Sequence, residues 1–530
     1  MSDSGADKAS YDVVVVGAGH NGLTAAGYLA RAGLSVLVLE RLDHVGGAAV
    51  SARTFPGLPA ELSRYSYLVS LLPEQVARDL ELSVQLRSRP TASYSPTVRD
   101  GRHVGLYVEH DEREATRESF QALTGSEAEY DAWQRFYADV AAVAAKVAPS
   151  LTQPLQTAHA MAEGLDPGVW AGLVERPLGE LVEDRFTDEL VRGVVATDGL
   201  IGTFASLHDP SLIQNRCFLY HLIGNGTGEW RVPVGGMGAV TRALERSARR
   251  AGAEILCNAG VSRIEADAGG SEVSWHDGHA GHTVRAGRVL ANVAPWVLKI
   301  LLGQEHTVPD FDAAKPQGAQ LKLNLLLSRL PRLKSGHDPQ QAWAGTFHVA
   351  EEYDALQRAY EEAAAGQVPT RPPGEFYCHS LTDPSILGDL AGRGVHTLTY
   401  FGLHMPAALF QDRPEAKDEA VRNAIAAVDE HLEEPLLDCV LRAPDGSLCL
   451  EAKVPQDVEA DLAMPGGHIF HGDLAWPWAA NREALDTPAQ QWGVATDVPS
   501  VLLCGSGARR GGAVSGLGGH NAAMAVLAQG

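Results

Sequence analysis

The stretch YDVVVVGAGHNGLTAAGYLARAGLSVLVLE, residues 11–40, decides the fold. Its β-branched run at 13–16 is typical of a parallel strand buried on both faces. A GxGxxG turn comes next, followed by a helix expected over 21–32 and a second strand expected over 34–39. A lone GxGxxG is weak evidence in a glycine-rich chain, but here strand, turn, helix, strand and a final acid coincide. The stretch therefore predicts a Rossmann-type unit that binds a dinucleotide.

Each glycine of the turn has its own expected role. Gly17 makes the tight turn, Gly19 lets the backbone approach a pyrophosphate, and Gly22 lets the helix pack on the strand. Glu40 ends the second strand, where its carboxylate is expected to accept hydrogen bonds from the adenosine ribose and to repel a 2′-phosphate. This acid disfavours NADP at the site.

A second glycine turn follows the acid at once. The residues expected to contact a second part of a long cofactor are Arg41, Gly46, Gly47 and Ala48. Taken alone, this turn is equally compatible with a surface turn. In its position just beyond the ribose acid it favours FAD over NAD.

The region GAGHNGLTAAGYLARAGLSVLVLERLDHVGGAA resembles the N-terminus of phytoene-desaturase-like FAD oxidoreductases. The branch with desaturase-type carotenoid ketolases and pyridine nucleotide-disulfide oxidoreductase domain-containing proteins is the nearest in pattern. The likeness recurs at 232–238, 465–473 and 504–516, so it spans nearly the whole chain, with a looser middle third. It implies FAD, and it implies that the backbone at Val261 meets the adenine. A carotenoid or another hydrophobic substrate is the expectation that it carries.

Composition limits the class of protein. With 530 residues, two or more domains are expected, and the net charge of −23 argues against nucleic acid or an anionic bilayer as the main partner. Six scattered cysteines without CxxC disfavour disulfide-reductase chemistry. The polar first ten residues and the absence of a long apolar run predict a cytoplasmic protein without a spanning helix, although contact with a membrane surface stays open.

The remaining pattern predicts an α/β fold in which a discontinuous FAD-binding domain carries an inserted α+β substrate domain. A long helical pattern over 111–200 is foreign to a nucleotide fold and is assigned to the insertion. The FAD-binding segments are expected at 8–82, 230–300 and 455–530, and the substrate or cap segments at 83–229 and 301–454.

A strand, a glycine-dense turn and a helix near the end of the chain are expected to return to the first sheet. The turn contains Gly505, Gly512 and Gly516, and the helix after it would direct its N-terminus at the flavin, where it stabilises negative charge. No second GxGxxG follows a strand. A separate NAD(P)H domain is therefore not expected, and the electrons should leave to oxygen, a quinone or another acceptor.

Three residues are predicted to line the pocket over the flavin. Lys322 interrupts an apolar strand, where a lysine is costly without a partner, and related flavin amine oxidases hold a water with such a lysine; a salt-bridged lysine is the alternative. His471 belongs to an HxxH pair without a recognisable third ligand, so no metal site is predicted. Arg509 departs from the histidine-proline or similar small pair usual in the resembling proteins, which leaves the substrate in doubt.

The predicted reaction is hydride removal from a C–H or C–N centre of a small organic substrate by non-covalent FAD. No cysteine or histidine has a recognisable context for flavin attachment. Two alternatives stay open: an oxidase or tailoring enzyme acting on a polar small molecule or amine, and an FAD-bound regulatory protein with little turnover. The sequence predicts neither the electron acceptor nor the oligomeric state.

Overall fold

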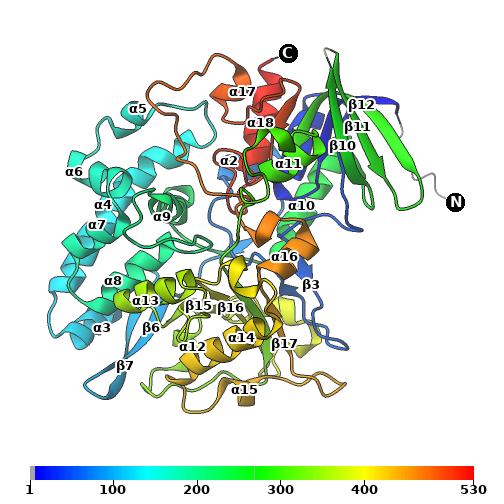
Figure 1. Ribbon diagram of the computed structural model, residues 1–530. Coiled ribbons are helices and arrows are strands. Elements are labelled where there is room, and N and C mark those ends of the chain that lie inside the picture. The colour runs from blue at the N-terminus through cyan, green and yellow to red at the C-terminus, as the bar shows by residue number, and fades with distance from the viewer. Residues whose placement is uncertain (1–5, 7, 268, 530) are drawn as a thin grey trace.

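A computed structural model describes residues 6, 8–267 and 269–529 (Figure 1). Seven strands of this part form the first sheet, in the order β10-β11-β12-β1-β2-β9, with β18 also paired to β12. They are β1 (Ser10–Val16), β2 (Val36–Leu39), β9 (Glu254–Leu256), β10 (Gly260–Asp267), β11 (Gly270–His276), β12 (Gly281–Ala291) and β18 (Val501–Leu503). The pairs β1–β2, β1–β12, β2–β9 and β12–β18 are parallel, whereas β10 and β11 form an antiparallel extension.

Three helices from distant parts of the chain pack around the central strand. Helix α1 (His20–Arg31) starts directly after the glycine turn, and both α10 (Met237–Arg250) and α18 (Leu517–Leu527) pack against it (Figure 1). The last four residues of β1 are all buried, as the β-branched run predicts. The predicted α/β fold with a Rossmann-type unit assembled from separated segments is confirmed.

A second sheet holds seven described strands in the order β17-β13-β16-β15-β14-β6-β7. They are β6 (Thr91–Arg99), β7 (Arg102–Glu109), β13 (Leu321–Leu327), β14 (Thr346–Val349), β15 (Gly374–Tyr377), β16 (His396–Gly402) and β17 (Leu450–Lys453). Every residue of β13 is buried, because β16 and β17 flank it and apolar side chains cover it. Side chains alternate along a strand, so Lys322 and Asn324 share one face.

A helical layer lies beside the second sheet, at the left of Figure 1. It contains α3 (Glu114–Thr124), α4 (Ala128–Ser150), α7 (Leu178–Arg185), α8 (Glu189–Ala196) and α9 (Ile213–Ile223). The aromatic side chains Trp133 and Phe136 of α4 are buried in the core of this layer, within the helical pattern expected over 111–200. The domain boundaries proposed from sequence at residues 82, 229, 300 and 454 stay predictions.

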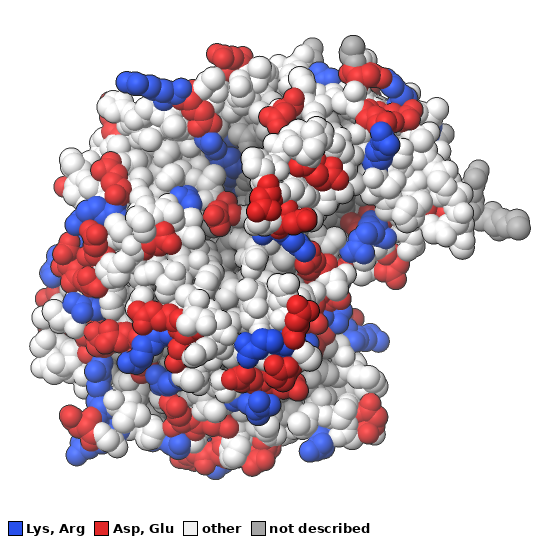
Figure 2. Space-filling model, viewed as in Figure 1, with Lys and Arg blue, Asp and Glu red and all other residues white. Residues whose placement is uncertain are grey.

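Shorter elements connect these layers. The helices are α2 (Glu74–Asp79), α5 (Ala158–Ala162), α6 (Pro167–Trp170), α11 (Pro295–Leu301), α12 (Pro339–Ala342), α13 (Tyr353–Ala364), α14 (Pro414–Asp429), α15 (Leu436–Cys439), α16 (Pro455–Leu462) and α17 (Pro488–Gln491). The strand pairs are β3 (Ser51–Ala52) with β4 (Leu62–Ser63), and β5 (Leu86–Arg87) with β8 (Val232–Pro233). None of the described helices combines the length and apolarity needed to cross a bilayer. Acidic and basic side chains are interspersed over the face shown in Figure 2.

Candidate active site

One cavity of about 600 Å³ extends from the first sheet to the second. Its nucleotide end is lined by the glycine turn after β1, by the end of β2 and by the start of β10. Its far end is lined by side chains of β13, β14 and β15, and the helical layer forms one wall. The residues of the cavity therefore come from segments far apart in the chain, and the two sheets jointly enclose it.

The turn after β1 is already shaped for a ligand. Gly17 has a φ of +99°, and a Cβ built there would lie 2.9 Å from the Asn292 carbonyl oxygen, so only glycine suits the position. Asn292 Nδ2 donates a hydrogen bond of 2.9 Å to the Gly17 carbonyl oxygen and fixes the turn. A Cβ at Gly19 would meet only Asn292 Nδ2, at 3.1 Å, and Gly19 lines the cavity. The turn thus leaves a cradle, open on the cavity side, into which phosphate oxygens fit.

Glu40 is held in place at the end of β2. Its carboxylate accepts hydrogen bonds from the backbone N–H of Ala18 at 2.7 Å and of Leu42 at 2.9 Å. These two bonds aim the side chain along the cavity wall, where it remains available to hydroxyl donors of a ribose. The donor set and the open cradle together fit the adenosine diphosphate part of FAD.

The structure separates the predicted cofactor residues into two groups. Eight line the cavity: Gly17, Gly19, Glu40, Arg41, Gly47, Ala48, Val261 and Gly512. Four do not line it and pack within the protein: Gly22, Gly46, Gly505 and Gly516. A Cβ at Gly22 would lie 2.2 Å from the Gly17 carbonyl oxygen, for example, so that glycine serves helix–strand packing.

The C-terminal turn reaches the cavity just before α18. His20 Nε2 lies 3.0 Å from the Ala513 carbonyl oxygen, and Asn21 Nδ2 donates to the Gly511 carbonyl oxygen at 3.3 Å. These contacts bind the turn to the start of α1. Gly512, Ala513 and Val514 consequently line the cavity between the two helix N-termini. The helix itself starts at Leu517, directly after Gly516.

Lys322 lines the far part of the cavity and is only 3% exposed. Its Nζ has no hydrogen-bond partner among the residues that the structure describes, and it lies 3.9 Å from the ring centroid of Tyr67. Burial holds the pKa of Lys322 well below its ordinary value, which favours the neutral amine. The salt-bridged alternative is not what the structure shows, and an unpaired buried amine facing a cavity fits a ligand or water contact there.

His471 and Arg509 differ in where they point. His471 lines the cavity with a left-handed φ of +65°, and burial lowers its pKa to about 4, so the neutral ring is present near neutral pH. Arg509 does not line the cavity, because its guanidinium donates to the Trp478 carbonyl oxygen and pairs with Glu483 at 2.9 Å. The expectation that Arg509 faces the substrate pocket is thereby corrected.

Replacing Arg509 by glutamine should therefore leave FAD content and turnover unchanged and alter stability by less than about 1 kcal/mol, as for other partly exposed ion pairs. The flavin absorbance per protein and the melting temperature of Arg509→Gln test this. A colourless or inactive variant with native stability would return Arg509 to the site.

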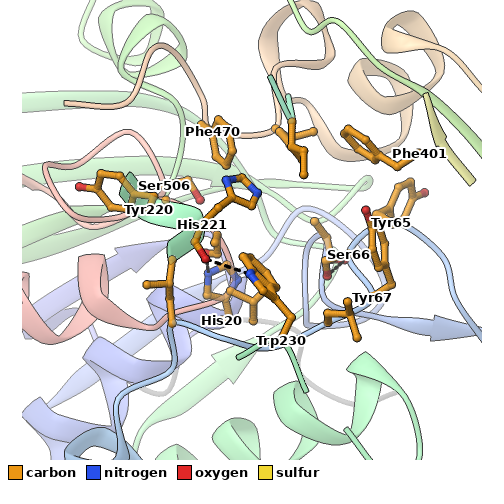
Figure 3. Close-up of a pocket in the computed structure, with 18 of the residues that line it drawn as sticks. His20, Tyr65, Ser66, Tyr67, Tyr220, His221, Trp230, Phe401, Phe470 and Ser506 are labelled. Carbon is orange, nitrogen blue, oxygen red and sulfur yellow. Dashed lines mark hydrogen bonds between the residues drawn. The ribbon is translucent and has the colours of Figure 1, made fainter. Parts of the chain in front are cut away.

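Aromatic side chains form much of the substrate wall (Figure 3). The labelled Phe, Tyr and Trp rings that line the cavity are Tyr65, Tyr67, Tyr220, Trp230, Phe401 and Phe470. Trp230 Nε1 donates to the His221 carbonyl oxygen at 3.0 Å, and the two rings stack with their centroids 5.2 Å apart. Such rings make this part of the cavity wall largely apolar.

One buried polar residue at the far end of the cavity, Glu375, was not predicted from the sequence. Glu375 lies on the cavity wall and accepts a hydrogen bond from the Tyr377 hydroxyl, and burial raises its pKa to about 7, aided by nearby Glu351. His348, Asp198 and Arg89 also line this end. The alternation of β14 and β15 places His348 and Glu375 opposite each other, but nothing in either short strand alone identifies its partner.

Comparison with known proteins identifies the family. A family model described as flavin containing amine oxidoreductase matches residues 22–321. The chain belongs to this family. It is 48% identical to an uncharacterised protein of Mycobacterium tuberculosis, covering 100% of this chain and 98% of that protein. It is 30% identical to the Rattus norvegicus pyridine nucleotide-disulfide oxidoreductase domain-containing protein 2, covering 99% of this chain and 94% of the rat protein.

A solved structure of a putrescine oxidase variant shares the fold with a TM-score of 0.58. The identity is 17%, with 98% of this chain and 99% of that chain covered. Membership of the flavin-containing amine oxidoreductase family confirms FAD as the cofactor and oxidoreduction as the class of reaction. The rat relative bears out one branch of the resemblance seen in the sequence, whereas the narrower likeness to phytoene desaturases and carotenoid ketolases stays a prediction.

Proposed function

We propose that this member of the family removes hydride from a hydrophobic organic substrate, with oxygen, a quinone or another external acceptor taking the electrons afterwards. One observation carries the proposal. The cavity that begins at the dinucleotide turn continues without interruption to an unpaired, buried lysine between aromatic walls. A cofactor held only for structure would need the first part of this cavity and not the second.

The residues of the chain would act as follows. The turn at Gly17 and Gly19 admits the phosphates, and Glu40 orients the ribose. Bound FAD supplies the two-electron acceptor. The neutral amine of Lys322 can accept a hydrogen bond from a water or a substrate group, and the rings of Tyr67 and Phe401 keep bulk water away.

A polar or amine substrate is the second candidate. Glu375 and Asp198 bring two carboxyl groups to the cavity wall, and an ammonium group is a natural partner for buried carboxylates. The similar structure is named a putrescine oxidase, so an amine substrate is compatible with this fold. The aromatic walls support a hydrophobic substrate, and these two acids support an amine substrate.

Anaerobic mixing separates these substrate classes. Polyenes, hydroxylated lipids and amines would each be mixed with the purified holoprotein, and the loss of oxidised flavin absorbance would be followed. We expect bleaching by an apolar polyene or lipid and recovery of the colour when the acceptor is added. Bleaching by amines alone would reject the hydrophobic substrate in favour of the second candidate.

NADH and NADPH should reduce the flavin slowly or not at all, because the sequence holds a single GxGxxG motif after a strand. The same anaerobic assay measures this, with dithionite as the positive control for reducible flavin. Rapid bleaching by either nucleotide would reveal a nucleotide site outside the cavity described above.

A further inference from the structure

Three ionisable side chains meet at the edge of the cavity, on the second sheet. His348 lies on β14, Glu351 follows that strand by two residues, and Glu375 lies on β15 directly opposite His348. One possible ligand atom from each residue lies within 4.8 Å of the others. His348 Nδ1 is 2.5 Å from Glu351 Oε2 and 3.7 Å from Glu375 Oε1. Two carboxyl groups and one imidazole thus converge on one point.

This cluster is buried, and one of its carboxylate oxygens lacks a well-formed hydrogen bond among the described residues. The side chains of His348, Glu351 and Glu375 are 7%, 0% and 3% exposed. Within the described part of the chain, neither Glu351 Oε1 nor the neighbouring Thr197 hydroxyl makes a well-formed hydrogen bond. Thr197 lies close enough to favour the charged form of Glu351, but this contact does not offset the burial that raises the pKa of Glu351. A fully buried carboxylate oxygen without a donor is costly unless a ligand completes it.

Nearby cations do not complete the cluster. Arg89 and Lys322 are basic side chains that line this end of the cavity; the Arg89 guanidinium donates to the Thr346 hydroxyl at 3.1 Å, and the Lys322 amine lies over the Tyr67 ring. No ion pair joins Arg89 to either glutamate among the described residues. Two acids therefore share one imidazole, and a positive charge of higher density would balance them.

The cavity borders two of the three side chains of the cluster. His348 and Glu375 line the cavity, whereas Glu351 does not. A ligand in the cavity would therefore contact His348 and Glu375 before Glu351. An ion held by His348 and Glu375 would also be within reach of Glu351, because possible ligand atoms of the three residues lie within 4.8 Å of one another.

From this arrangement we infer that His348, Glu351 and Glu375 bind a divalent transition-metal ion. One imidazole nitrogen and two carboxylate oxygens are donors that suit Zn²⁺, Mn²⁺ and Fe²⁺ better than Ca²⁺. Binding displaces the proton shared by His348 and Glu351, so it releases a proton to solvent. Three protein ligands leave a position open towards the cavity, where a water or an oxygen or nitrogen atom of the substrate would bind.

Zn²⁺ is the probe for the test. The FAD-loaded protein would be treated with a chelator, exchanged into metal-free buffer and titrated with ZnCl₂ in a calorimeter, and the metal retained after desalting would be measured by mass spectrometry. We expect one tightly held ion per chain. This readout is independent of turnover, so it can succeed or fail whatever the substrate is.

Matched variants locate the ion. Glu351→Gln should weaken Zn²⁺ binding at least about tenfold, since even outer partners of metal ligands contribute that much. Glu352→Gln is the control, because Glu352 binds Arg371 and Thr97 and does not belong to the cluster. The Zn²⁺ affinity of the Glu352→Gln protein should therefore match that of the unaltered protein. If Glu351→Gln loses its flavin colour or its circular dichroism, Glu375→Gln takes its place. An unaltered protein that retains no Zn²⁺, or equal affinities for all variants, would overturn the assignment.

Discussion

Replacing Gly19 by valine should give a folded protein without flavin colour. Gly19 has an ordinary φ of −69°, so a side chain is compatible with its backbone. A Cβ there would meet Asn292 Nδ2 alone, at 3.1 Å, and the remaining methyl groups would extend into the cavity. The valine would occupy the space that the pyrophosphate needs, while the packing of the first sheet would survive. FAD binding is expected to be lost.

The same substitution at Gly22 should instead destabilise the folded protein. A Cβ at Gly22 would lie 2.2 Å from the Gly17 carbonyl oxygen and 2.8 Å from Asn292 Nδ2, which no rotamer can relieve. We expect a loss of stability of at least about 1–3 kcal/mol and little soluble protein. Flavin absorbance, circular dichroism and melting temperature distinguish the two variants. A Gly19→Val protein that carries stoichiometric FAD would remove the cofactor assignment at this turn.

Replacing Lys322 by methionine should separate stability from catalysis. The change removes an amine that is buried without a hydrogen-bond partner, at the loss of its contact with the Tyr67 ring. Because burial favours the neutral amine, the contact with the Tyr67 ring carries little cation–π energy, and the cost of an unsatisfied polar group, about 1–3 kcal/mol, dominates the balance. The free energy of unfolding should therefore stay level or rise. One half-reaction should slow about 10²-fold if the amine positions a proton or a water.

Lys453 provides the matched control, since it pairs with Lys322 across β13 and β17. It is also buried, but its Nζ donates to Asp461 at 2.6 Å and lies 3.7 Å from Glu451. Lys453→Met should lower the free energy of unfolding by about 1–3 kcal/mol, because it leaves a charged partner unpaired. Stopped-flow reduction and reoxidation together with thermal melts test both variants. Unchanged rates for Lys322→Met, accompanied by lost stability, would make Lys322 a structural lysine.

The parts of the site that could be predicted are those that neighbouring residues encode. The glycine spacing after β1 and the acid after β2 belong to one local unit, and the lysine of β13 stands out in an apolar strand. His348 and Glu375 give no such signal, because their meaning depends on pairing between strands that only the folded sheet brings together.

The misplacement of Arg509 has a local cause. Either of two adjacent arginines in a glycine turn can be the buried one. The left-handed φ of +68° at Arg510 directs the two side chains in opposite directions. Arg510 is the buried one, and its guanidinium donates to the carbonyl oxygens of Ser150, Gln153 and Trp492. Composition and spacing are the same whichever arginine turns inward, so the sequence pattern contains no information on that choice.

The discontinuous first sheet also sets the timing of assembly in the cell. Its central strand, β1, is made long before β18, and β12 cannot gain its second parallel partner until β18 has been made. The glycine turn that lines the cavity before α18 emerges later still. During most of translation the nascent chain therefore exposes an incomplete parallel sheet, a state that invites aggregation. Chaperone protection until β18 has been made, and a supply of free FAD from then on, should consequently raise the yield of active protein.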